Sequence, residues 1–206
     1  VAMGNPLAPP ETLEYLVGYT RATAVVTVPQ VAEILRPVVE AEGSEVQAMF
    51  VVPDAPTGSD PEARISGMAF TGKVQELAPA LDAARPMDPV MVHRDEPAIW
   101  LFTSGSTGEP KANVHTQRDF AFNTEVYAKK TVGYRRDDVT ISVPRLFFGY
   151  ATGTNLMFPF AVGATTGLFS ERPTPESLAN AIATYRPTVV TNVPTMLGTL
   201  LEYDEE

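Results

Sequence analysis

Residues 103–111, Thr-Ser-Gly-Ser-Thr-Gly-Glu-Pro-Lys, combine the chemical groups that bind a polyphosphate. Gly105 and Gly108 let the backbone bend and approach an anion closely, and four hydroxyl side chains supply neutral hydrogen-bond donors. Backbone N–H groups in such a loop can form an anion-binding concavity, and Lys111 adds a mobile positive charge. The spacing is not that of a Walker A loop, so the chemistry of P-loop NTPases is not expected. The alternative is a plain Ser/Gly turn.

The rest of the composition excludes several other chemistries. The chain has no cysteine, so it can form neither a disulfide, a thiolate zinc site nor a cysteine nucleophile. His93 and His115 lie too far apart in sequence to suggest a metal cluster, and nothing near either completes a catalytic pair. We therefore expect no protein metal site. The net charge of −10 argues against nucleic acid as a partner, because binding a phosphate backbone requires a basic face.

The N-terminal sequence and the apolar segments do not suggest secretion or membrane insertion. Residues 1–16 lack the basic and apolar regions of a signal peptide. Residues 146–170 carry no formal charge, but their glycines and proline make them a poor membrane-spanning helix. We expect no membrane span and a cytoplasmic location. With 44% hydrophobic and 19% charged residues over 206 residues, the chain can fold as one large α/β unit or two lobes.

Short apolar strands alternate along the chain with amphipathic helices, and this order predicts an α/β fold of mostly parallel sheets flanked by helices. A strand at 98–102, expected to be fully buried, runs directly into the loop described above. Residues 53–64 are expected to form a surface loop. Further strands are expected at 23–28, 46–52, 139–143, 164–169 and 188–192, and helices at 12–19, 31–43, 73–81, 118–133, 175–186 and from Pro194.

The run LFTSGSTGEPK resembles the phosphate-binding signature of the adenylate-forming superfamily, which includes acyl- and aryl-CoA synthetases, adenylation domains and luciferases. The similarity continues on both sides and covers almost the whole chain. The stretch RLFFGYATGTNLMFPFAVGATTGLFSERPTPE is similar to benzoate–CoA ligases in particular. One departure is Ala112, because the family usually has glycine after the lysine. An alanine methyl is a small change and leaves the phosphate role intact.

The resemblance implies a ligase that works in two halves. A carboxylate attacks the α-phosphate of ATP to give an acyl-adenylate and pyrophosphate, and the thiol of coenzyme A then displaces AMP. Mg²⁺ is expected with the nucleotide. Lys111 would be the catalytic residue of this chain, acting on phosphate charge. The residues that would hold the β- and γ-phosphates are Thr103, Ser104, Gly105, Ser106, Thr107, Gly108 and Lys111.

The same resemblance implies where the acid binds. Phe148, Gly149 and Tyr150 would line the pocket, and Val193 and Thr195 would lie near its far wall. Aromatic rings beside a glycine suit a flat ring such as benzoate. The alternative to a pocket is a Phe/Tyr stripe that fills the core. The alternative substrate is a medium- or long-chain fatty acid. The alternative to a ligase is a non-catalytic module that binds a nucleotide or a partner protein.

The domain organisation implied is a part of the large N-terminal domain of such an enzyme. Residues 1–97 would form a partial first lobe, and residues 98–206 the phosphate-loop strand and a second lobe. The adenine-binding motif, the ribose-binding aspartate and the lysine-bearing C-terminal lid domain of the family are not found before Glu206. The 206 residues alone are therefore expected to make no thioester.

Overall fold

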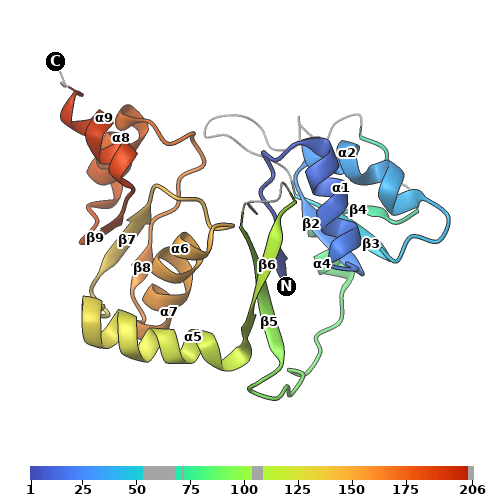
Figure 1. The fold of residues 1–206 in the computed structure, drawn as a ribbon, viewed down its shortest axis with the longest axis horizontal. Helices are drawn as coiled ribbons and strands as arrows, with labels where there is room; N and C mark the ends of the chain where they lie inside the picture. The colour runs from blue at the N-terminus through green and yellow to red at the C-terminus, as the bar shows by residue number, and fades with distance from the viewer. Residues whose placement is uncertain (53–67, 71, 104–108, 204–206) are drawn as a thin grey trace. The chain divides into compact units, whose positions relative to one another are not determined.

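The computed structural model describes residues 1–52, 68–70, 72–103 and 109–203, and it divides the chain into two compact units (Figure 1). The first unit consists of Val1–Met3, Val92–Ser104 and Lys111–Glu206. The second consists of Gly4–Met91 and Gly105–Pro110. The surface loop expected at residues 53–64 lies outside the described residues.

The second unit is a parallel three-stranded sheet packed against helices. The strand order is β2 (Ala24–Thr27), β3 (Ala48–Val51) and β4 (Val74–Glu76). Helices α1 (Pro10–Tyr19) and α2 (Pro29–Glu40) begin with proline, whose fixed φ suits the first helical turn. The core is made of apolar side chains from both helices and the sheet, namely Leu13, Val31, Ala32, Leu35, Val39, Val46, Met49, Val51 and Val74.

The helix predicted over residues 73–81 is wrong in its first part. Residues Val74–Glu76 form β4, and the helix α4 begins only at Leu77 and ends at Ala83. Val74 is 1% exposed and pairs with Met49, so burial on the sheet overrides the weak helical pattern of a short segment. Helix α2 ends at Glu40, before the expected glycine, and the Lys73 ammonium donates to the carbonyl of Val39 near that end at 3.0 Å.

In the first unit, one sheet contains β1 (Ala2–Met3), β5 (Pro97–Thr103) and β6 (Lys111–Thr116). Strand β5 pairs in parallel with β1 and antiparallel with β6. Strand β6 was not predicted from the sequence. The prediction that β5 is fully buried is wrong, since the central residues of β5 are half-buried. An apolar run alone does not distinguish burial on one face from burial on both.

The other sheet of the first unit is parallel, in the order β8 (Thr165–Thr166), β7 (Val139–Ser142) and β9 (Val189–Thr191). Helices α8 (Pro175–Tyr185) and α9 (Pro194–Leu201) follow its outer strands. The connection from β7 to β8 contains the short segments α6 (Gly149–Thr152), η2 (Gly153–Met157) and α7 (Phe158–Val162). The core of this sheet is Ile141, Val143, Leu178 and Ala181.

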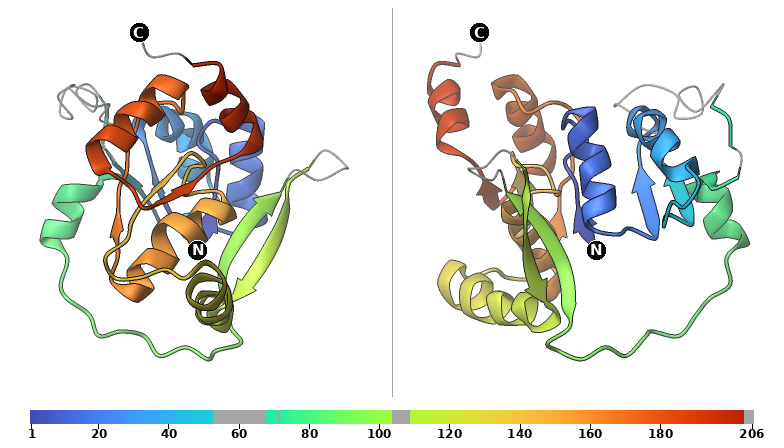
Figure 2. Two further views of the ribbon diagram at one scale, coloured as in Figure 1. Left: turned by 90° about the vertical axis from the view of Figure 1, so that its left-hand side faces the viewer. Right: turned by 45° about the vertical axis from the view of Figure 1, so that its right-hand side comes forward.

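A long helix joins the two sheets of the first unit. It starts as α5 (Gln117–Asn123) and continues as the π-helical η1 (Thr124–Val132), and Figure 2 draws the two as one helix. This confirms the helix expected over residues 118–133. The α/β fold of mostly parallel sheets flanked by helices is also confirmed. Among the residues that the structure describes, no helix combines the length and apolar character needed to cross a bilayer.

Candidate functional site

Strands β5 and β6 pair as an antiparallel hairpin (Figure 2), and the predicted phosphate loop connects them in sequence. The end of the hairpin that carries Thr103 and Lys111 is called the hairpin tip. Thr103 and Lys111 are direct cross-strand partners, and the Thr103 hydroxyl donates to the Lys111 carbonyl at 3.5 Å. The two ends of the predicted loop are therefore adjacent in space. The five remaining residues assigned to phosphate binding lie outside the described residues, namely Ser104, Gly105, Ser106, Thr107 and Gly108.

The Lys111 side chain is exposed at the start of β6. Within the described part of the chain its ammonium has neither a hydrogen-bond nor an ion-pair partner, so it can respond to an anion bound at the hairpin tip. Ala112, where the family usually has glycine, pairs with Phe102 inside the hairpin. A β-strand does not require the conformational freedom of glycine, so alanine fits this position.

The far end of β6 is fixed to helix α5 by a network of polar contacts. Asp119 accepts hydrogen bonds from the Thr116 backbone N–H at 2.8 Å and the Thr116 hydroxyl at 2.9 Å. His115 Nδ1 lies 3.4 Å from the same carboxylate. These bonds, the Thr116 backbone bond most of all, lower the pKa of Asp119. His115 therefore has a structural position at the helix start, and the network holds the phosphate-loop hairpin on the helix.

Glu109 and Pro110, the two loop residues before Lys111, are described and belong to the second unit. The Tyr15 hydroxyl on helix α1 donates to the Pro110 carbonyl at 3.5 Å. Desolvation raises the pKa of the Tyr15 phenol, and Tyr19 and Glu109 add to this shift. Tyr15 thus borders the loop, although the sequence gives no signal for it because a tyrosine in an amphipathic helix is usually part of the packing.

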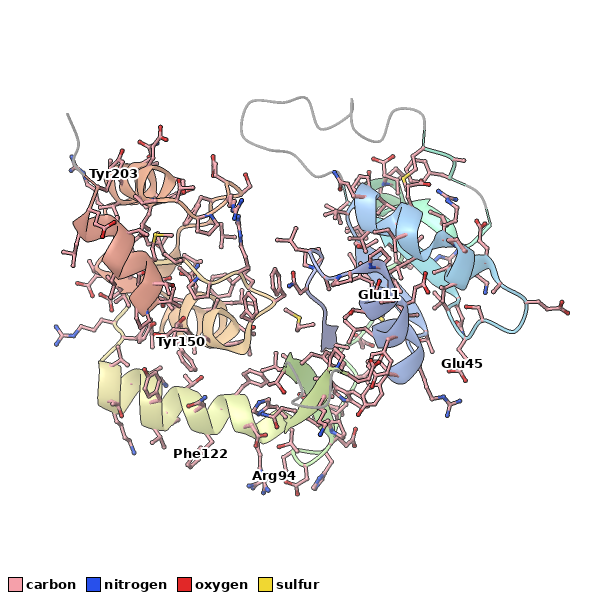
Figure 3. The ribbon with its side chains drawn as sticks, turned by 45° about the horizontal axis from the view of Figure 1, so that its top comes forward. Glu11, Glu45, Arg94, Phe122, Tyr150 and Tyr203 are labelled. Atoms are coloured by element: carbon pink, nitrogen blue, oxygen red, sulfur yellow. The ribbon has the colours of Figure 1, made fainter. Side chains whose placement is uncertain are left out.

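The aromatic residues assigned to the acid pocket lie where the chain after β7 enters α6. Phe148 is the residue before this helix, and Tyr150, labelled in Figure 3, is its second residue. The Phe148 N–H donates to the Arg145 carbonyl at 2.9 Å, and the Thr152 hydroxyl donates to the carbonyls of Leu146 and Phe148 at 2.6 and 3.0 Å. These bonds define the turn. Phe148 and Tyr150 remain 48% and 52% exposed, so both rings are available to a ligand and neither is a core residue of the described structure.

Gly149, between these two aromatic residues, touches the phosphate-loop strand. A Cβ added at Gly149 would lie 2.6 Å from Leu101 Cδ1 in β5. Real Cβ atoms do not approach so closely, so the absence of a side chain permits this contact. The turn assigned to the acid is therefore packed against the strand that leads to Thr103, within the same unit.

Val193 and Thr195 follow the neighbouring strand β9. The Val143 N–H donates to the Thr191 carbonyl at 2.9 Å, so the carboxyl ends of β7 and β9 lie side by side. Val193 is half-buried and packs against the Ile141 cluster, while Thr195 is exposed in the first turn of α9. The structure thus brings the two groups of predicted pocket residues to the same edge of one sheet. In open α/β sheets ligands bind at this carboxyl edge.

Sequence reasoning missed two residues that contact the predicted pocket turn or belong to it, Leu101 in β5 and Arg145 after β7. The Arg145 side chain binds main-chain carbonyls of the segment that follows β8. A signal for Arg145 was present, because it is the last charged residue before the uncharged stretch 146–170. Leu101 gave no signal, since an apolar residue in a strand is expected whatever it contacts. Among the described residues there is no group of three or more His, Asp or Glu side chains placed to hold a metal ion.

The chain is similar in sequence and structure to known AMP-binding enzymes and aryl acid–CoA ligases. The family model for AMP-binding enzymes matches residues 1–206. The chain is 42% identical over 107 residues to a benzoate–CoA ligase of Thauera aromatica, covering 52% of this chain and 20% of the relative. It is 33% identical over 165 residues to an anthranilate–CoA ligase of Pseudomonas aeruginosa, covering 76% of this chain and 32% of the relative. The crystal structure of a benzoate CoA ligase from Burkholderia xenovorans matches with a TM-score of 0.80 at 28% identity, over 99% of this chain and 37% of that one. The chain therefore spans only a part of these relatives.

Proposed function

Because this chain belongs to the AMP-binding enzyme family, we propose that it is part of an ATP-dependent ligase that joins an aryl carboxylic acid to coenzyme A. One observation carries the proposal furthest: Leu101 in the phosphate-loop strand is packed against Gly149 in the turn of Phe148 and Tyr150. An acid bound at that turn would lie close to a nucleotide bound at the hairpin tip. Joining the two reactants requires this proximity.

The phosphate loop would bind the phosphates of ATP and stabilise the negative charge on the leaving pyrophosphate. Thr103 and Lys111, at the two ends of the hairpin tip, would hold the β- and γ-phosphates together with Ser104, Gly105, Ser106, Thr107 and Gly108. As the carboxylate oxygen attacks the α-phosphorus, the bond to the pyrophosphate oxygen breaks and negative charge develops on the leaving group. The Lys111 ammonium, free among the described residues, would stabilise that charge. The coenzyme A thiol then attacks the acyl carbon, and AMP leaves.

We propose that Mg²⁺ accompanies the nucleotide and neutralises part of the phosphate charge. The described residues contain no group of three or more His, Asp or Glu side chains that could hold the ion. The phosphate oxygens of the nucleotide would therefore supply much of its coordination. Thr103, whose hydroxyl lies at the hairpin tip, is exposed. ATP, coenzyme A and a small carboxylic acid would be the partners of the enzyme, acting in the cytoplasm.

The acid pocket would be formed by Phe148, Gly149 and Tyr150 on one side and by Val193 and Thr195 on the other. Exposed aromatic rings at the carboxyl edge of a parallel sheet suit a planar aryl acid, which can pack against them edge-to-face or in an offset stack. The relatives reported above are named for benzoate and anthranilate, which are both aryl acids. We therefore favour an aryl acid over a fatty acid and over a non-catalytic binding role.

The experiment is carboxylate-dependent exchange of pyrophosphate into ATP by the intact protein that carries this chain. Benzoate, 2-aminobenzoate and 4-hydroxybenzoate would be compared with a medium-chain and a long-chain saturated fatty acid. We expect exchange with an aryl acid at a higher kcat/KM than with either fatty acid. A preference for a fatty acid would overturn the substrate class, and no exchange with any carboxylate would overturn the ligase assignment.

A further inference from the structure

Arg145 holds three consecutive main-chain carbonyls at the carboxyl edge of the parallel sheet. Its Nη1 donates to the Phe169 carbonyl and its Nη2 to the Ser170 carbonyl, each at 3.0 Å, and Nη2 also donates to the Glu171 carbonyl. The guanidinium carbon lies 6.0 Å from the centroid of the Phe169 ring. Since Arg145 follows β7 and residues 169–171 follow β8, these bonds connect the ends of two neighbouring strands.

The chemistry of the guanidinium explains why one side chain can do this. Its planar fork donates along several fixed directions at once, whereas a lysine ammonium is a compact point charge. Burial lowers the pKa of Arg145 and the Glu171 carboxylate opposes that shift, so the group is partly desolvated yet remains charged. Hydrogen bonds from a charged donor are about twice as strong as neutral ones, which favours an ordered segment where helix and strand hydrogen bonds are absent.

The segment that Arg145 binds is also held from its other side. The Tyr185 hydroxyl on helix α8 donates to the Leu168 carbonyl at 2.5 Å. Four successive carbonyls, from Leu168 to Glu171, are therefore bound by two side chains. Residues 167–174 contain no helix or strand, so these side-chain bonds restrain a backbone that lacks regular hydrogen bonding between β8 and α8.

Arg145 also belongs to the turn that carries the predicted acid pocket. Its carbonyl accepts the hydrogen bond from the Phe148 N–H at 2.9 Å, which closes the turn just before Gly149 and Tyr150. The backbone of Arg145 thus sets the position of Phe148, and its side chain fixes the turn relative to the next strand. Movement of this residue would displace the pocket turn first, and would reach the β5–β6 hairpin only through the contact of Gly149 with Leu101.

From this geometry we propose that Arg145 is a positioning residue for the acid substrate, which it serves by clamping residues 169–171 to the turn of Phe148 and Tyr150. This role rests on the proposed function. It needs no contact between the Arg145 charge and the substrate. Replacement by lysine, which keeps the charge and loses the fork, therefore separates the clamp from simple electrostatic attraction of a carboxylate.

The test compares Arg145→Lys with the wild-type intact protein, measuring kcat, KM for the best aryl acid and KM for ATP. A small displacement of a binding group can cost about ten- to a hundredfold, so we expect KM for the acid to rise about tenfold. KM for ATP should change much less. A purely structural loss would reduce the active fraction and the melting temperature without selectively raising KM for the acid.

Two further variants complete the design. Tyr185→Phe removes only the hydroxyl that holds Leu168, and it should raise KM for the acid in the same direction but less, which keeps the test valid if Arg145→Lys does not fold. Arg172→Lys makes the same chemical change at an exposed position next to the clamped segment and should behave as wild type.

The outcomes separate this proposal from the one on which it rests. A selective rise in KM for the acid in Arg145→Lys, or in Tyr185→Phe if the first variant does not fold, supports the clamp. An unchanged KM for the acid in folded Arg145→Lys, with the wild type active, overturns the clamp alone. A wild-type protein that activates no carboxylate overturns the proposed function and the clamp with it.

Discussion

Leu101 occupies the space that a side chain on Gly149 would need, with its Cδ1 2.6 Å from the position of a Cβ. Leu101 lies two residues before Thr103 at the base of the predicted phosphate loop, and Gly149 lies between the two exposed aromatic residues Phe148 and Tyr150. The contact thus couples the strand that presents one proposed ligand to the turn that presents the other. Adding a single methyl group at Gly149 tests how tightly the two residues are packed.

Gly149→Ala should force Leu101 out of its present rotamer and displace the turn. Inserting a methyl group into a packed contact typically costs about 1–3 kcal/mol, so we expect the free energy of unfolding to fall by that order and KM for the acid to rise. Thermal or denaturant unfolding and steady-state kinetics measure the two effects.

Gly18→Ala is the matched control, because a Cβ at Gly18 would meet no atom within 4 Å and alanine favours a helix. It should leave the stability unchanged or increase it. The double variant Leu101→Ala/Gly149→Ala should lose less stability than the sum of the two single variants. Equal stability of Gly149→Ala and Gly18→Ala would show that Leu101 does not limit Gly149.

Tyr134 should titrate about two pH units above an ordinary tyrosine. Its side chain is 6% exposed and its hydroxyl donates to the Thr154 carbonyl at 2.9 Å. Burial, with smaller contributions from Tyr127, Tyr150 and Asp138, raises its pKa from 10.0 to about 12. The absorbance of phenolate in wild-type protein minus that in Tyr134→Phe should rise near pH 12, and a rise near pH 10 would contradict the burial of this group.

The same shift predicts how stability depends on alkaline pH. The folded pKa lies above the unfolded value, so the contribution of Tyr134 is complete below pH 10 and is lost as the pH rises towards 12. Tyr134→Phe, which removes one buried hydrogen bond, should be less stable at neutral pH by about 1 kcal/mol. The difference between the two proteins should shrink between pH 10 and 12, as measured by denaturant unfolding at each pH.

Asp119 should stabilise the junction of β6 and α5 only while it is ionised. Its pKa is lowered by the Thr116 backbone bond and, to a smaller extent, by the Thr116 hydroxyl and His115. A lowered folded pKa means that the contribution is present above the ordinary value of 3.8 and is lost as the pH falls through the folded value. Asp119→Asn should therefore melt below the wild type at neutral pH and approach it in acid.

Asp137→Asn provides the comparison for this prediction, since Asp137 is exposed and accepts no hydrogen bond among the described residues. Its melting temperature should follow that of the wild type at every pH. Melting curves measured across the acid range test both variants. A constant difference between Asp119→Asn and the wild type, down to the lowest pH, would show that the charge of Asp119 does not support the helix start.

Much of the fold follows from local patterns in the sequence. The strand β7 and the helix α8 were predicted to within a residue or so, because a β-branched run and a proline at the first helical turn are strong local signals. The segment 73–81 and the strand β6 were not predicted correctly. The conformation of residues 74–76 depends on pairing with β3, which is distant in sequence. Strand β6 pairs with β5, its neighbour along the chain, but its sequence KANVHT has no apolar run that would predict a strand.

The sequence predicted the family of the chain, but not the contacts that surround the candidate site. The order of residues 103–111 indicated phosphate chemistry, and the family assignment agrees with the resemblance seen in that run. The contacts of Leu101 with Gly149 and of Arg145 with residues 169–171 join strands that are far apart along the chain. No local pattern encodes such contacts, because they arise only when the sheets assemble. The phosphate-binding roles within residues 103–111 and the pocket roles of Phe148, Gly149, Tyr150, Val193 and Thr195 stay predictions.

Binding of the ATP phosphates by residues 103–111 can be tested with one substitution. Lys111→Ala in the intact protein should reduce benzoate-dependent exchange of pyrophosphate into ATP by about a hundredfold or more, because it removes a charge that stabilises the leaving pyrophosphate. Lys130→Ala, which removes an exposed lysine on η1, should keep the wild-type rate. Wild-type exchange in Lys111→Ala would contradict the assignment of this hairpin as the phosphate site.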